Sequence, residues 1–185
     1  DTLLPAMARP SRSAAVAMDA WRAALLAWLL MVAVAAIFCV RYYTAVDYEW
    51  MRTLLVGEAT PRHAELFAAA RGALLACEDA MRPGRTMGAV FAAHARVFDE
   101  RGLRPHRLNA CGYSLGAVYA PSWMDWPMFY AGNPVVIEPG MVFFLHMILM
   151  DSDTGAAMTL GRTSLVGQDA AEPLSKAPLE LVVRC

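Results

Sequence analysis

The sequence lacks an excess of charge of either sign, because its 185 residues carry 16 Lys and Arg against 17 Asp and Glu. A balanced charge provides no attraction toward a polyanion, so nucleic acid is not expected as a partner. Cysteine is also scarce, and the four residues Cys39, Cys77, Cys111 and Cys185 form no C-x-x-C pair. This spacing excludes a zinc knuckle or a dithiol redox motif and favours reduced thiols in a cytoplasmic protein.

Internal repeats are absent as well, and the length suits one domain with its own core better than two. Residues 1–20, rich in Ala, Pro, Ser and Arg without a period, indicate a disordered or processed leader. Residues 23–40 contain no charge and are just long enough for a membrane-spanning helix. Two interpretations of 21–40 stay open: a membrane anchor with a cytoplasmic N-terminus, or an apolar segment that replaces another N-terminus.

Two helices are expected in the middle of the chain. The first begins after Thr60 as N-cap, has proline at its first position and stops at Pro83-Gly84. Thr86 caps the second, which is expected to close near Gly102. His94 stands beside the apolar face of this second helix with no ligand residue four positions further on, so no metal pair is predicted there.

The remaining segments have the composition of strands. Residues 42–56 are rich in aromatic and β-branched side chains and end at a glycine. Val135–Val136 and the runs 141–150 and 156–166 are further strand predictions, the last two separated by Asp-Ser-Asp-Thr-Gly. Asp and Gly tolerate the backbone of tight turns, so these two strands are expected to form a hairpin.

Residues 112–116 read Gly-Tyr-Ser-Leu-Gly and match the G-x-S-x-G elbow of serine hydrolases. That elbow requires an apolar strand before the serine and a helix after it. Here the preceding residues 106–111 are polar, and Pro121 arrives before a helix could form. The one histidine downstream is His146, inside an apolar run. A hydrolase that uses Ser114 is therefore an unfavourable alternative.

A different resemblance covers residues 41–185. In order and at similar intervals, the stretches YEWMRTLLVG, RPG, CGYSLGAVYAPSW, NPVVIEPGMVFFLHMIL, GAAMTLGRTSLV and EPLS resemble the second half of the pita-bread catalytic domain. This is the metallopeptidase family of Xaa-Pro aminopeptidase, prolidase, creatinase and ectoine hydrolase. The resemblance implies an α+β fold with a curved antiparallel sheet and packed helices, shortened on its N-terminal side, and a homodimer as the assembly.

The resemblance also implies two divalent ions, Mn, Co or Zn, held by one His, two Glu and two Asp. In this sequence the histidine position falls on Tyr113, and the glutamate positions fall on His146 and Gly161. The aspartate positions fall on Glu49 and Phe38. Hard cations need oxygen ligands that offset their charge, and only Glu49 offers one. We therefore expect no metal cofactor bound at these positions.

Two functions follow from the resemblance. The first is a metal-independent hydrolase of peptide or amide-type C–N bonds, in which His146 transfers protons and Tyr113 donates a hydrogen bond. His106, Asp125 and Trp123 are candidate substrate contacts, with a turn cap as the alternative for Asp125 and a surface loop position as the alternative for His106. The second is a non-catalytic binding or scaffold protein that keeps the fold without the chemistry. A core role for His146, satisfied by a neighbouring polar group, is the alternative to both.

Overall fold

The computed structural model describes residues 21–29, 31–32, 50–116 and 125–184. The chain divides into two units, Asp1–Val46 and Asp47–Cys185. The described residues of the first unit, 21–29 and 31–32, are helical. Among the residues that the structure describes, no helix combines the length and apolar character needed to cross a bilayer. The rest of the apolar segment 23–40 lies outside the described residues.

The second unit contains the two predicted helices. Helix α2 spans Pro61–Ala80 and helix α3 spans Met87–Asp99, and a 3-10 turn, η1, follows at Arg104–His106. The Thr60 hydroxyl oxygen accepts a hydrogen bond from the backbone N–H of His63, and the His63 ring nitrogen Nδ1 accepts one from the backbone N–H of Thr60. This reciprocal cap sets the start of α2. The predicted helix starts are thus confirmed. Helix α3 ends at Asp99, and a turn carries the chain on to Gly102.

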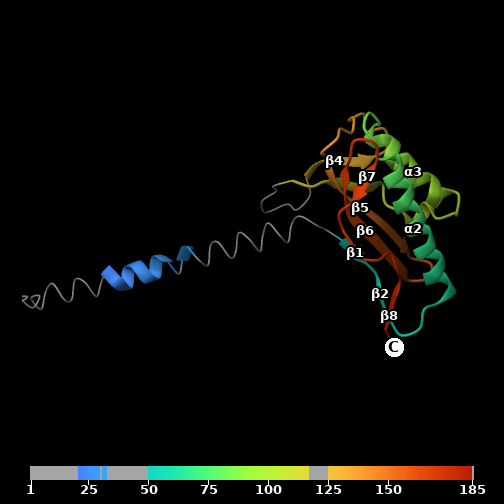
Figure 1. The fold of residues 1–185 in the computed structure, drawn as a ribbon. Coiled ribbons are helices and arrows are strands. Elements are labelled where there is room, and N and C mark those ends of the chain that lie inside the picture. The colour runs from blue at the N-terminus through green and yellow to red at the C-terminus, as the bar shows by residue number, and fades with distance from the viewer. Residues whose placement is uncertain (1–20, 30, 33–49, 117–124, 185) are drawn as a thin grey trace, which may run out of the picture. The chain divides into compact units, whose positions relative to one another are not determined.

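The large sheet has the order β1-β6-β5-β3-β4, with every neighbouring pair antiparallel (Figure 1). A further strand, β7, pairs with β6, and two short parallel strands form a separate ribbon. The strands are β1 (Trp50–Arg52), β2 (Leu54–Val56), β3 (Ala110–Ser114), β4 (Asp125–Tyr130), β5 (Val142–Asp151), β6 (Ala156–Val166), β7 (Ala171–Pro173) and β8 (Val182–Arg184).

The predicted hairpin is confirmed, because β5 and β6 pair along their whole length from Val142↔Leu165 to Asp151↔Ala156. The described part of the predicted strand over 42–56 is extended, but it forms two short strands, β1 and β2, with a break at Thr53. The chain leaves the large sheet at Thr53, whose Oγ1 accepts the N–H of Thr159 at 2.7 Å. The prediction of a strand at Val135–Val136 is wrong, since this segment contributes only the isolated bridge Thr86↔Val136.

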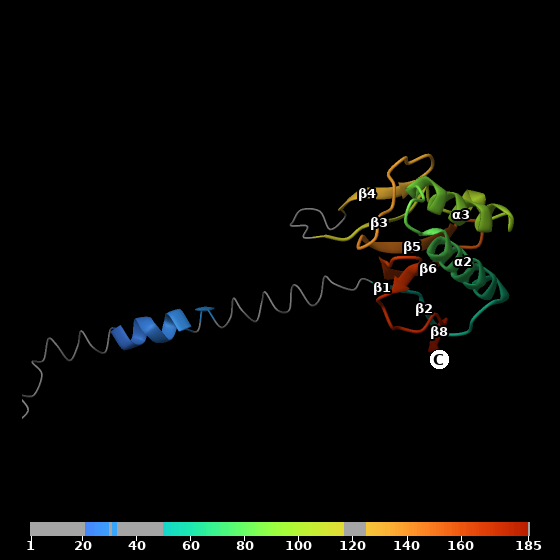
Figure 2. The ribbon, with the colours of Figure 1, turned by 45° about the horizontal axis from the view of Figure 1, so that its top comes forward.

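The side chains of β5 alternate between the two faces of the large sheet. The odd-numbered residues Phe143, Leu145, Met147 and Leu149 belong to the buried core shared with α2 and α3, which lie on one side of the sheet (Figure 2). Three alanines of α2, Ala69, Ala70 and Ala73, are fully buried and let that helix approach closely. The even-numbered residues of β5 point away from the helices, and we call that side the second face of the sheet.

Candidate functional site

Three rings gather on the second face and form what we call the aromatic–histidine cluster. Tyr113 of β3 lies directly opposite Phe144 of β5, and His146 follows two residues further along β5. The ring centroids lie 5.6 Å apart for Tyr113 and Phe144, 5.8 Å for Tyr113 and His146, and 6.0 Å for Phe144 and His146. The cluster is nearly closed to solvent, with exposed fractions of 5%, 2% and 8% for Tyr113, Phe144 and His146.

Gly161 of β6 completes this arrangement, because it pairs directly with His146. The structure therefore brings together the three positions Tyr113, His146 and Gly161 that the resemblance singled out. No side chain fits at Gly161: a Cβ there would lie 2.7 Å from the carbonyl oxygen of Leu145 and 2.8 Å from the Phe144 ring. The Phe144 ring thus fills the space next to Gly161.

His146 is a neutral group in this setting. Burial lowers its pKa from the ordinary value of 6.5, because an imidazolium ion would lose its hydration there. Its Nδ1 is buried and has no hydrogen-bond partner among the described residues. A buried ring nitrogen without a partner costs free energy, and a ligand that hydrogen-bonds to it would recover that cost.

The donor set of the cluster does not fit a pair of divalent cations. Tyr113 offers a phenol whose ordinary pKa of about 10 keeps it protonated at neutral pH. His146 offers one imidazole, and Gly161 offers no side chain. Cations such as Mn²⁺ need several carboxylate oxygens to replace their water and offset their charge. Glu49 and Phe38, the other two positions of the expected metal site, lie outside the described residues.

The remaining candidate contacts do not join the cluster in the part of the chain that is described. Asp125 begins β4, and only its backbone is described. Trp123 lies outside the described residues. His106 ends η1 and approaches Asp151 at the far end of β5, 3.9 Å between Nδ1 and Oδ1. In the sequence Asp151 is part of a predicted turn, and no pattern of residues connects it to His106.

Ser114 is not on a nucleophile elbow. It lies in β3 between two antiparallel partners and pairs with Phe143 of β5. Residues directly opposite each other in an antiparallel pair point to the same face, so Ser114 faces the helix side together with Phe143. His146 points to the second face, and the two side chains cannot form a hydrogen-bonded pair. This geometry agrees with the unfavourable interpretation of the serine motif.

The profile of metallopeptidase family M24 matches residues 29–168. The chain belongs to this family. A probable dipeptidase PepE of Mycobacterium bovis is 30% identical over 133 residues, which are 71% of this chain and 34% of that protein. The crystal structure of dipeptidase PepE from Mycobacterium ulcerans covers 72% of this chain and 35% of its own, with a TM-score of 0.66 and 26% identity.

This M24 protein also resembles the N-terminal domain of the FACT complex subunit SPT16 from chickpea (Cicer arietinum). The TM-score is 0.64 at 18% identity, over 75% of this chain and 34% of that one. The structural neighbours confirm the α+β pita-bread fold that the sequence predicts. The chain spans about a third of the length of the relatives it matches.

Gly161 offers a direct test of this geometry. We expect Gly161→Ala to lower the free energy of unfolding by about 1 to 3 kcal/mol, because the new methyl group would press on a main-chain oxygen that cannot move alone. Gly72 is the matched control: it lies inside α2, where an added Cβ would come no closer than 3.6 Å to its nearest neighbour, a Val97 side-chain carbon. Gly72→Ala should raise stability by roughly 0.5 to 1 kcal/mol. Urea unfolding measures both, and equal effects would contradict the crowding at Gly161.

Proposed function

We propose that this M24 protein binds a peptide or amide-type ligand at the aromatic–histidine cluster and does not carry out two-metal hydrolysis. The cross-strand pair of His146 and Gly161 carries this proposal, because it puts an imidazole and a bare backbone where the family resemblance calls for two glutamates. On this assignment, the cluster lacks the carboxylates that a metal pair needs, and this absence supports the proposal.

The chemistry of the cluster supports a ligand with an amide. Its side chains are aromatic rings that are nearly closed to solvent, and His146 Nδ1 offers a hydrogen-bonding group without a partner among the described residues. An apolar surface with few polar groups is typical of small-molecule sites, since the polar groups orient the ligand. Among the relatives, PepE is named a probable dipeptidase, which supports a peptide as the ligand.

A second candidate function is hydrolysis of a C–N bond without metal. The observation that favours it is the ring nitrogen Nδ1 of His146, which has no hydrogen-bond partner among the described residues. Burial lowers the pKa of this imidazole and so favours the neutral form, which a general base needs. In such a step a water oxygen bonds to the amide carbon while His146 takes the water proton. The C–N bond then breaks, and His146 gives that proton to the leaving amine.

Titration calorimetry with an Xaa-Pro dipeptide such as Ala-Pro, without added metal, tests the proposal. We expect binding by the unaltered chain and a loss of affinity of about tenfold or more in His146→Leu, which keeps the volume of the side chain but removes its hydrogen bond. Ser114→Ala is the matched control, since Ser114 faces the other side of the sheet, and its affinity should stay within about twofold of that of the unaltered chain. A thermal melt of each variant shows that it is folded.

The fate of the peptide separates the two candidates. An intact peptide after long incubation, with or without Mn²⁺, supports a binding protein. Hydrolysis that needs no metal, resists a chelator and disappears in His146→Leu supports the second candidate. Hydrolysis that requires Mn²⁺ and stops with a chelator would overturn both, and equal affinities for His146→Leu and Ser114→Ala would overturn a site at this cluster.

A further inference from the structure

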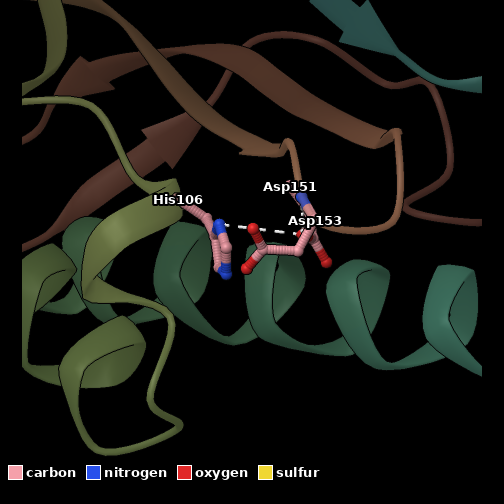
Figure 3. Close-up of side chains that lie close together, drawn as sticks. All are labelled: His106, Asp151 and Asp153. Carbon is pink, nitrogen blue, oxygen red and sulfur yellow. Dashed lines mark hydrogen bonds and ion pairs between the residues drawn. The ribbon is translucent and has the colours of Figure 1, made fainter.

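Three side chains of types that can bind a metal ion converge at the end of the β5–β6 hairpin, away from the aromatic–histidine cluster. They are His106 of η1, Asp151 at the last position of β5 and Asp153 in the hairpin turn. One ligand atom from each lies within 4.8 Å of the others, and the side chains point toward one another (Figure 3). His106 Nδ1 is 3.9 Å from Asp151 Oδ1. His106 lies far from the two aspartates in the chain, so the tertiary fold creates this group.

The backbone around these residues is held in place. An isolated bridge between Arg107 and Leu149 fixes the end of η1 against β5, and thereby fixes where His106 can reach. Asp151 Oδ1 accepts the N–H groups of Asp153 at 3.1 Å and Thr154 at 3.3 Å, which sets the shape of the turn. Ligands that are positioned before binding lose little entropy when a cation arrives.

The charges at this place are incompletely paired. Asp151 is buried and bound by Arg62, with 2.7 Å between Nη2 and Oδ2. Asp153 is exposed, and its carboxylate has no hydrogen-bond or ion-pair partner among the described residues, although it lies close to the carboxylate of Asp151. Arg62 also holds Glu65 at 2.8 Å, so one guanidinium serves two carboxylates while Asp153 keeps its charge. Two close carboxylates repel each other, and a cation between them would remove that repulsion.

We propose that His106, Asp151 and Asp153 form a site for one divalent transition-metal ion, separate from the positions of the family's metal pair. One imidazole nitrogen with two carboxylate oxygens suits Zn²⁺ or Mn²⁺, because Mg²⁺ and Ca²⁺ favour oxygen ligands alone. Three protein ligands leave at least one position for water. Ligands at about 2.1 Å from an ion lie at most about 4.2 Å apart, so the 4.8 Å spread needs only a small closure, which the exposed Asp153 side chain can provide.

Titration calorimetry of the full chain with Zn²⁺, and its Co²⁺ absorption spectrum, test this site. We expect one ion per chain, a spectrum without a thiolate charge-transfer band, and an affinity at least about tenfold lower in Asp153→Asn and in His106→Ala. Asp79→Asn, an exposed carboxylate on α2, and His63→Gln, which keeps the helix cap, are the matched controls and should bind as the unaltered chain does. His146→Leu should also bind normally, which separates this site from the aromatic–histidine cluster.

Two results would overturn the metal site. The first is the absence of stoichiometric binding, which would mean that Arg62 and the turn amides already satisfy Asp151 and that the group is structural. The second is binding that survives Asp153→Asn but is lost in His146→Leu or shows a thiolate band, which would place the ion elsewhere. Asp153 is exposed, so its variant is expected to fold, and an unchanged melting curve confirms that before the titration.

Discussion

Replacing Glu78 by alanine is expected to lower the free energy of unfolding by about 3 to 5 kcal/mol. Glu78 lies near the end of α2 with its side chain 10% exposed, and it accepts hydrogen bonds from Arg162 Nε at 2.6 Å and from Ser164 Oγ at 2.9 Å. A second bond from Arg162 Nη2 makes the ion pair bidentate. Removal of the carboxylate would leave a guanidinium that is 14% exposed without its partner.

The ion pair of Glu78 and Arg162 connects α2 to β6, the strand that carries Gly161. Arg162 follows Gly161 directly in β6, so the Glu78 variant is expected to loosen the His146–Gly161 register as well. Urea unfolding measures the stability, and dipeptide titration measures the effect on the site. Glu78→Met together with Arg162→Met should recover most of the loss, because an apolar pair leaves no uncompensated charge.

Asp79 provides the control for Glu78 because it is the next residue and also pairs with an arginine, Arg82, at 2.5 Å. Its side chain is 79% exposed, and exposed ion pairs contribute little. We expect Asp79→Ala to change stability by less than about 1 kcal/mol. Similar losses for Glu78→Ala and Asp79→Ala would show that burial does not strengthen the Glu78 pair as argued.

A loss of stability of about 4 kcal/mol is expected from His94 alone as the pH falls from about 6.5 to about 3. His94 is fully buried between Phe91 and Phe98, at centroid distances of 5.4 and 4.8 Å. Burial first, and then the charge of Arg107, lower its pKa from 6.5 to about 3. Below pH 6.5 the unfolded chain therefore takes up a proton that the folded chain excludes, so acid favours unfolding.

His94→Leu tests this origin of acid sensitivity. Both ring nitrogens of His94 lack hydrogen-bond partners among the described residues, so the apolar replacement should raise stability at pH 7 by about 1 to 3 kcal/mol. Its advantage should increase further at about pH 4. An equal advantage of His94→Leu at neutral and at acidic pH in urea unfolding would contradict the account.

Local features could be predicted because their causes are local. Thr60 and Thr86 cap α2 and α3 as expected, since a cap depends on residues within one turn. The hairpin around Asp151–Gly155 follows from turn residues between two apolar runs. The exit of the chain at Thr53 could not be predicted, because it depends on a hydrogen bond to Thr159, 106 positions away.

The candidate sites divide in the same way. The resemblance to the family identified Tyr113, His146 and Gly161 as three separate positions along the chain. The register of β3, β5 and β6 brings these positions together. For His94, helical spacing indicated a position beside the apolar face, but its complete burial without a polar partner among the described residues depends on how α3 packs. For His106, a substrate contact stays a prediction, and only the structure shows that it lies next to Asp151.

The sequence by itself determined where helices start and which two runs form the hairpin, and its resemblance to the family predicts that Tyr113, His146 and Gly161 replace metal ligands. These properties depend on residue identity and on neighbours close in the chain. Only the tertiary structure decided that Phe144 fills the space beside Gly161 and that His106 meets Asp151 and Asp153. Contacts of this kind arise from sheet register and helix packing, which join residues far apart in sequence and leave no periodic pattern along the chain.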